Sequence, residues 1–183
     1  MQADSEHTKD VVQDFTREGN NYLRQLHIWL GISSAGGATA LAGLAANLPN
    51  PRFAFEYLLV SFWSFLVGVV FAGLGLYAIS QRSFAKGEHF ASSHNREKCD
   101  TAINAIPLII SSPRRLADET NKPRNDLIAK REIEHQRAEH AWIIQGRWQT
   151  CCGLSLTISG MSFVFGFGWP LLKASLLGQN IVP

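Results

Sequence analysis

The sequence predicts an all-α fold, that of a polytopic membrane protein with three transmembrane helices and a cytoplasmic helical hairpin continuous with helices two and three. Three stretches lack Asp, Glu, Lys and Arg, at residues 26–48, 57–80 and 150–172. Each exceeds the ~20 residues that a helix needs to cross a bilayer core, and none shows the polar face of a soluble helix. The charged residues are concentrated instead in residues 81–149, so the mean hydropathy of −0.01 hides this segregation.

Residues 1–25 precede the first span and are predicted to form a cytoplasmic amphipathic segment. Four apolar side chains fall on one helical face: Val11, Phe15, Tyr22 and Leu26. We expect Gly19 to interrupt this helix, because glycine disfavours a helix interior. Five acidic residues in the segment argue against a signal peptide, so we expect the first apolar run to stay as an anchor.

The basic residues alternate between the segments that flank the spans. Three precede the first span, one (Arg52) lies in the first loop, twelve lie in residues 81–149, and one (Lys173) lies in the tail, residues 173–183. The positive-inside rule therefore predicts a cytoplasmic N-terminus and hairpin, with the first loop and the tail outside. This pattern favours a bacterial inner membrane, and a eukaryotic organelle membrane is the alternative.

The long segment between spans two and three is predicted to form two helical arms, residues 81–105 and 124–149, that extend from those spans. Helices usually end at or before the residue that precedes a proline, and three prolines mark the expected break: Pro107, Pro113 and Pro123. The second arm is strongly charged, with a broken apolar stripe. It is either a solvated stalk or a stalk that finds partners by charge pairing in an oligomer.

Small residues recur at helical spacing in every span. Because lipid provides little hydrophobic drive between helices, their association relies on close backbone approach at such residues. The predicted helix-packing residues are Gly36, Ala40, Gly43, Ser64, Gly68, Ala72, Gly75, Ser155, Ser159, Ser162 and Gly166. In one interpretation, contacts within the chain use all of these small-residue faces. In the other, the faces left over bind partner subunits.

The hairpin carries the one constellation that resembles a site. Glu132 and His135 stand three residues apart, with Glu139 four residues further, a spacing that can place metal ligands on one helix face. Counting from the membrane edge, an antiparallel hairpin brings His89 level with His140 and His94 level with His135. We hypothesise a metal-binding or pH-sensitive contact at one of these levels, because histidine titrates near neutrality.

The basic residues of the hairpin are interleaved with acidic ones, twelve against nine, so no nucleic-acid partner is predicted. A small basic cluster flanks the hairpin tip and would suit an acidic partner or a small anion: Arg114, Arg115, Lys122 and Arg124. No nucleotide, zinc-protease or hydrolase motif is present, and three cysteines without a CxxC pair predict neither a disulfide framework nor a zinc ribbon. No cofactor is expected.

Three functions follow from these patterns. The first is a non-catalytic accessory or scaffold subunit of a membrane complex, with the bilayer and itself or other membrane subunits as partners. The second is a homo-oligomeric pore-forming or membrane-disrupting effector that is gated through the hairpin. The third is an enzyme or metal protein that uses the hairpin residues. The spans contain no ionisable residue between their ends, which disfavours an ion-coupled carrier or pump.

Overall fold

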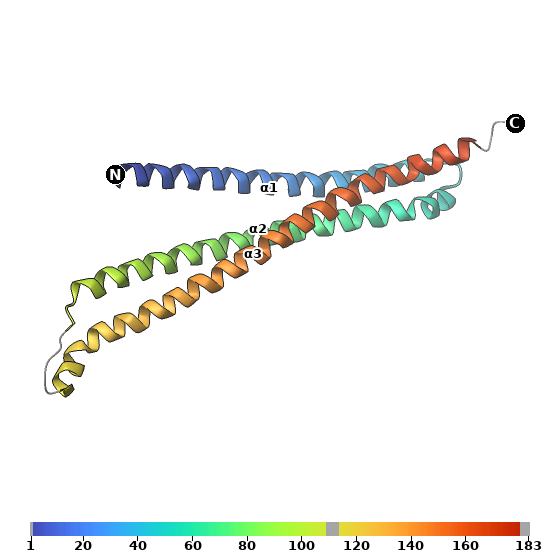
Figure 1. The fold of residues 1–183 in the computed structure, drawn as a ribbon. Helices are drawn as coiled ribbons and strands as arrows, with labels where there is room; N and C mark the ends of the chain where they lie inside the picture. The colour runs from blue at the N-terminus through green and yellow to red at the C-terminus, as the bar shows by residue number, and fades with distance from the viewer. Residues whose placement is uncertain (1, 109–113, 180–183) are drawn as a thin grey trace. The chain divides into compact units, whose positions relative to one another are not determined.

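The structure, a computed structural model, describes the backbone of residues 2–108 and 114–179 and the side chains of residues 17–108, 118–119 and 121–173. It consists of three helices, α1 (Gln2–Ala46), α2 (Pro51–Ala105) and α3 (Arg114–Gln179), and the described part has no strand (Figure 1). The all-α prediction is confirmed. All three helices are long and apolar enough to cross a membrane, which indicates a membrane protein.

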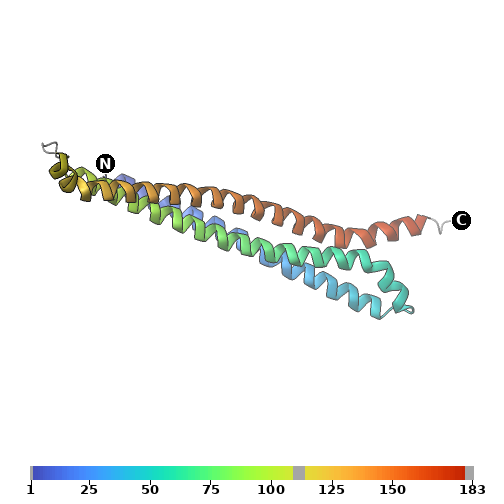
Figure 2. The same ribbon diagram turned by 90° about the horizontal axis from the view of Figure 1, so that it is seen from below.

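The chain forms two compact units, each described by itself. The first comprises residues 1–79 and 150–183, and the second comprises residues 80–149. Helices α2 and α3 contribute residues to both. In the second unit these two helices run antiparallel, as both views show (Figures 1 and 2).

A short turn joins α1 to α2 and is set by local sequence (Figure 2). Pro51 occupies the first position of α2, where its missing N–H has no helical partner to lose. The side chain of Asn50 caps this helix, because its Oδ1 accepts a hydrogen bond from the backbone N–H of Phe53 at 3.4 Å.

Two predicted helix boundaries are wrong. Helix α1 runs through Gly19 without a break, because a penalty of about 1 kcal/mol for one glycine is small beside a helix of this length. On the predicted amphipathic face, Tyr22 and Leu26 are exposed, and the side chains of Val11 and Phe15 lie outside the described residues.

The second wrong boundary concerns the hairpin. Helix α3 begins at Arg114, so Pro123 lies inside the helix rather than in the break before it. The fixed φ of proline is itself helical, and the residue removes one hydrogen bond rather than all of them. Helix α2 ends at Ala105, two residues before Pro107, as the proline rule predicts; Pro113 lies outside the described residues.

Packing in the first unit is built around one aromatic side chain. Phe65 on α2 is fully buried, and its ring lies against the backbone of Gly37 on α1 and Gly166 on α3. The rings of Phe167 and Phe163 meet it edge-on, with centroids 5.0 and 6.4 Å away. The two glycines leave the space that this ring fills, so Phe65 closes the centre of the unit.

A second core cluster joins α1 to the start of α2. Ala45, Ala54 and Leu58 are buried there, and three partly buried side chains pack against them: Leu41, Tyr57 and Phe62.

Candidate functional site

The small residues of α2 form its contact with α1. Gly68, Ala72 and Gly75 are all buried. A methyl group added to Gly68 would lie 2.7 Å from the Ser34 hydroxyl oxygen, and one added to Gly31 would lie 3.4 Å from the Ala72 side chain. The two backbones approach this closely only because these α2 positions lack larger side chains.

The serines of α3 bind the backbone of α2. The Ser159 hydroxyl donates to the Gly68 carbonyl oxygen at 2.8 Å, and the Ser155 hydroxyl donates to the Phe71 carbonyl oxygen. Both serines are buried. The structure therefore brings Ser155 and Ser159 of α3 together with the predicted face of α2, whereas Gly166 packs against the Phe65 ring.

The predicted face of α1 is wrong for contacts within the chain. Gly36, Ala40 and Gly43 are exposed, and a methyl group added to either glycine would meet nothing within 4 Å. The chain uses Gly31 and Gly37 instead. Successive residues are 100° apart around a helix, so Gly36 and Gly37 point in different directions, and a run of uniformly small residues did not reveal which one faces α2.

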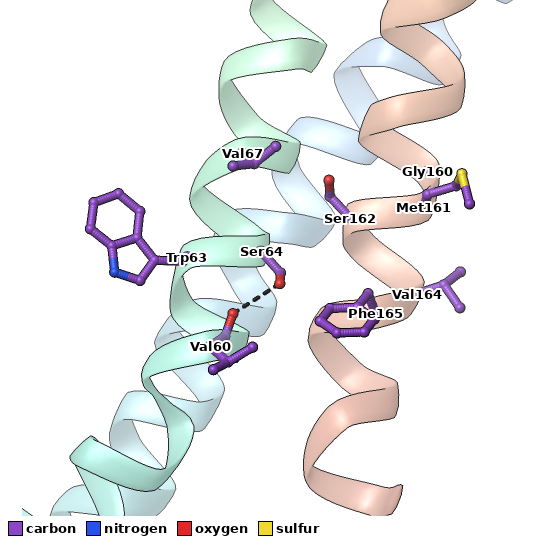
Figure 3. A pocket seen from close by; sticks show the side chains of 9 residues that line it. All are labelled: Val60, Trp63, Ser64, Val67, Gly160, Met161, Ser162, Val164 and Phe165. Atoms are coloured by element: carbon purple, nitrogen blue, oxygen red, sulfur yellow. Dashed lines mark hydrogen bonds between the residues drawn. The ribbon is translucent and has the colours of Figure 1, made fainter.

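Ser64 and Ser162, the remaining predicted packing residues, line an open groove of about 850 Å³ between α2 and α3 (Figure 3). The Ser64 hydroxyl donates to the Val60 carbonyl oxygen of its own helix at 2.9 Å, so its polar group is satisfied locally. The other lining residues are apolar or glycine: Val60, Trp63, Val67, Gly160, Met161, Val164 and Phe165. The two serines therefore border a gap rather than a tight contact.

A buried histidine was missed from the sequence. His27 on α1 is fully buried in the first unit. Its Nδ1 lies 2.8 Å from the Leu23 carbonyl oxygen and donates to it, while its Nε2 is buried without a hydrogen-bond partner. The expectation that the spans hold no ionisable residue between their ends treated His27 as a boundary, although the predicted first span, residues 26–48, includes it. A lone histidine followed by charge-free sequence was the available signal.

The hairpin histidines lie at the predicted levels but do not meet. His89 donates from Nδ1 to the Ala138 carbonyl oxygen at 3.0 Å, and its ring centroid lies 5.5 Å from that of Trp142. These partners bracket His140, which is itself exposed. The predicted His89–His140 pairing is therefore wrong, because the axial level was right and the direction around the helix was not.

The second predicted pair is also not formed. His94 is exposed. His135 accepts a hydrogen bond at Nδ1 from the Arg96 guanidinium at 3.1 Å, and its Nε2 lies 3.5 Å from the Glu139 carboxylate. Glu132 is exposed. Among the described residues, no group of three His, Cys, Asp or Glu side chains is placed to hold a metal ion.

The ion pairs of the second unit lie at or near its surface, except that the Glu134 carboxylate, which pairs with Arg137 at 3.4 Å, is buried. Arg131 and Asp100 form an exposed pair at 3.5 Å across the two helices, a type of contact that contributes little to stability. Burial, and secondarily the charge of Arg82, lower the pKa of Lys86. Its ammonium lies 5.8 Å from the centroid of the Phe90 ring, a contact that favours the charged form and therefore opposes this lowering of the pKa.

The basic cluster at the hairpin tip is described only in part. Lys122 is exposed, and Arg124 is half-buried with an Nε that has no hydrogen-bond partner. The side chains of Arg114 and Arg115 lie outside the described residues.

No known family model matches this chain, and no curated protein and no solved structure is significantly similar to it. The packing and chemistry of the described residues are therefore the basis for inferring its function.

Proposed function

We propose that this chain is a non-catalytic membrane subunit that assembles with itself or with other membrane proteins through a second small-residue face of α1. We define this α1 face by Gly36, Ala40 and Gly43. The observation that supports the proposal is that these residues are exposed within the chain, whereas most of the predicted packing residues of α2 and α3 make contacts inside it.

The chemistry of the α1 face suits a neighbouring helix in lipid. Glycine and alanine permit close backbone approach, which drives helix association where the hydrophobic effect does not. The neighbouring Thr39 hydroxyl donates to the Gly36 carbonyl oxygen at 2.9 Å, so the face offers a partner little unsatisfied polarity. The bound partner would be another transmembrane helix.

The proposed setting is the one that the distribution of basic residues supports. The N-terminus and residues 81–149 lie on the cytoplasmic side of a bacterial inner membrane, and residues 173–183 lie on the other side. In this role the second unit contacts partners, and it carries out no reaction.

A homo-oligomeric pore-forming or membrane-disrupting effector is the second candidate, and one observation favours a particular form of it. Phe65 fills the centre of the first unit, so an opening would have to form between chains. The α1 face and the groove between α2 and α3 belong to different helices. Contact between two different surfaces of neighbouring copies generates a ring when the rotation closes.

Native mass spectrometry of the tagged full chain, extracted mildly from its own membranes, tests the proposal. We expect a complex that is lost when Gly36 and Gly43 are both replaced by leucine, because the added side chains hold the partner helix away. The matched control is Val70→Leu, at an exposed position of α2, which should leave the complex intact.

The composition of the complex and its conductance together separate the two candidates. Other chains in fixed ratio support an accessory subunit, whereas a homo-oligomer of fixed size fits both candidates and is followed by conductance measurements, in which only a pore gives a current. If the double leucine variant keeps the wild-type complex, the α1 face is not the interface and the proposal is wrong.

A further inference from the structure

His27 occupies an unusual position for a titratable side chain. It lies one residue inside the predicted first span, and none of its surface is exposed. The ring packs directly on α2 at Gly75, where an added methyl group would overlap it. Glycine at position 75 is therefore what allows the histidine to dock.

The hydrogen bonding of His27 fixes which tautomer its neutral ring adopts. Since Nδ1 donates to the Leu23 carbonyl oxygen, the neutral ring carries its second nitrogen, Nε2, as an acceptor. No described group donates to it. The nearby Ser155 hydroxyl, 3.0 Å from where a methyl group on Gly75 would lie, donates to the Phe71 carbonyl oxygen instead.

No opposite charge is available to His27 from the helices that pack on it. Helix α2 has no acidic or basic residue between Glu56 and Arg82, and α3 has none between Arg147 and Lys173. The titratable side chain near Gly75 on α2 is Tyr77, which is exposed. Those near Ser155 on α3 are the exposed thiol of Cys151 and the buried thiol of Cys152. On α1 itself, Arg24 is exposed and cationic.

Three further hydroxyl oxygens of the first unit are buried without partners, those of Ser34, Tyr57 and Ser61, and the two serines are fully buried. Buried polar side chains normally have a hydrogen-bond partner, and exceptions call for an explanation. An ionisable side chain within a membrane span is by default a candidate functional site. His27 combines both features.

We propose that His27 is a proton-binding site that controls the docking of α1 on α2 and α3. The neutral ring docks on Gly75 with Nε2 unprotonated. A proton from water bonds to the Nε2 lone pair and gives an imidazolium, which has one more N–H donor and a positive charge in an interior without a carboxylate. The charged ring is hydrated only when this end of α1 moves away from Gly75.

This inference does not depend on the proposed assembly, because a single chain contains all of the groups involved. It also moves the pH-sensitive site from the hairpin histidines, where the sequence placed it, to the first unit.

Distance measurements between spin labels test the proposal on the full chain in lipid nanodiscs. The labels are attached at Ile28→Cys on α1 and Leu74→Cys on α2, both exposed positions, after the three native cysteines are replaced by serine or alanine. Samples at about pH 8 and about pH 5 bracket the range in which histidine changes charge. We expect the label distance to lengthen at the lower pH.

Two variants assign this change to His27. His27→Gln cannot become charged and should remove the shift, whereas His94→Gln, at an exposed histidine of the hairpin, should retain it. Gly75→Ala should give the longer distance already at the higher pH, because its methyl group takes the place of the ring. A wild-type distance that does not change with pH, or a shift that survives in His27→Gln, would overturn the proposal.

A measurement without substitution keeps the test valid if the glutamine variant does not fold. In ¹⁵N-histidine-labelled wild-type protein in bilayers, the His27 nitrogens should show one protonated nitrogen at the higher pH and two at the lower. Signals that stay those of a neutral ring at both pH values would contradict proton binding.

Discussion

At the scale of single residues, the hydroxyl groups of α3 differ in whether they bond to the backbone of α2 or to that of their own helix. Ser155 and Ser159 both donate to carbonyl oxygens of α2, whereas Thr157 between them donates to the Gly153 carbonyl oxygen of its own helix at 3.0 Å. The three side chains are chemically similar, and only the first two join helices. They therefore give a matched set for measuring what an interhelical hydrogen bond contributes in this chain.

We predict that Ser159→Ala destabilises the folded chain by about 1 kcal/mol, the scale measured for interhelical hydrogen bonds in membranes. The variant leaves the Gly68 carbonyl oxygen without this donor. Thr157→Ala should change the stability by much less, because it breaks no contact between helices. Unfolding in bicelles, followed by steric trapping, measures both. Equal losses in the two variants would show that the Ser159 bond does not hold α3 to α2.

The residue scale also shows why His27 was missed. Its level along α1 can be read from the sequence, but its burial cannot, because burial depends on Gly75, 48 positions away. A histidine next to Leu26 and Ile28, both exposed, gives no local sign that it faces inward.

At the scale of helices, the sequence predicts which segments are helical better than it predicts which face of each helix packs on its neighbours. The three apolar runs identify the three helices because charge is absent over a length that only a membrane helix requires. The facing of α2 could also be predicted, since Gly68, Ala72 and Gly75 alternate with bulky residues. Helix α1 has small residues on most sides, so the spacing predicted Gly36 as a contact residue, whereas the structure uses Gly37.

The hairpin shows the same limit. A rise of 1.5 Å per residue fixes the level of each histidine from the membrane edge, and His89 does lie beside the turn that carries His140. The direction in which each side chain points depends on how the two helices are rotated against each other. That rotation follows from packing over the whole pair, which no short spacing encodes.

The close approach of α1 and α2 leads to a prediction at this scale. Gly68→Ala places a methyl group 2.7 Å from the Ser34 hydroxyl oxygen, and we expect a loss of about 1–3 kcal/mol from overpacking. Gly73→Ala is the control on the same helix, because an added methyl group there meets nothing within 4 Å. It should be neutral or slightly stabilising.

A second substitution identifies the cause. Ser34→Ala removes a hydroxyl that has no partner, and it should restore part of the stability lost in Gly68→Ala. The same unfolding assay measures the single and double variants. If Ser34→Ala gives no rescue, the methyl group added at position 68 is not in conflict with Ser34.

At the scale of the whole molecule, the interior of the first unit differs from that of a soluble helical protein. Glycines, buried serines and the Phe65 ring make its central contacts, as expected where lipid is the solvent, and aliphatic side chains pack in the cluster around Leu58. The same rule explains why small residues left outside the unit point to a partner. In the proposed role, the function depends on the partner that binds the α1 face.

The α1 face is the central claim, and photo-cross-linking in intact membranes tests it most directly. A diazirine amino acid of leucine size replaces Ile32, an exposed residue one turn before Gly36, and a matched sample carries it at the exposed Leu154 of α3. We predict that irradiation joins the chain to one defined partner, another copy or a different membrane protein, from position 32 and not from position 154. Equal labelling from both positions, or lipid adducts alone from position 32, would contradict an assembly through the α1 face.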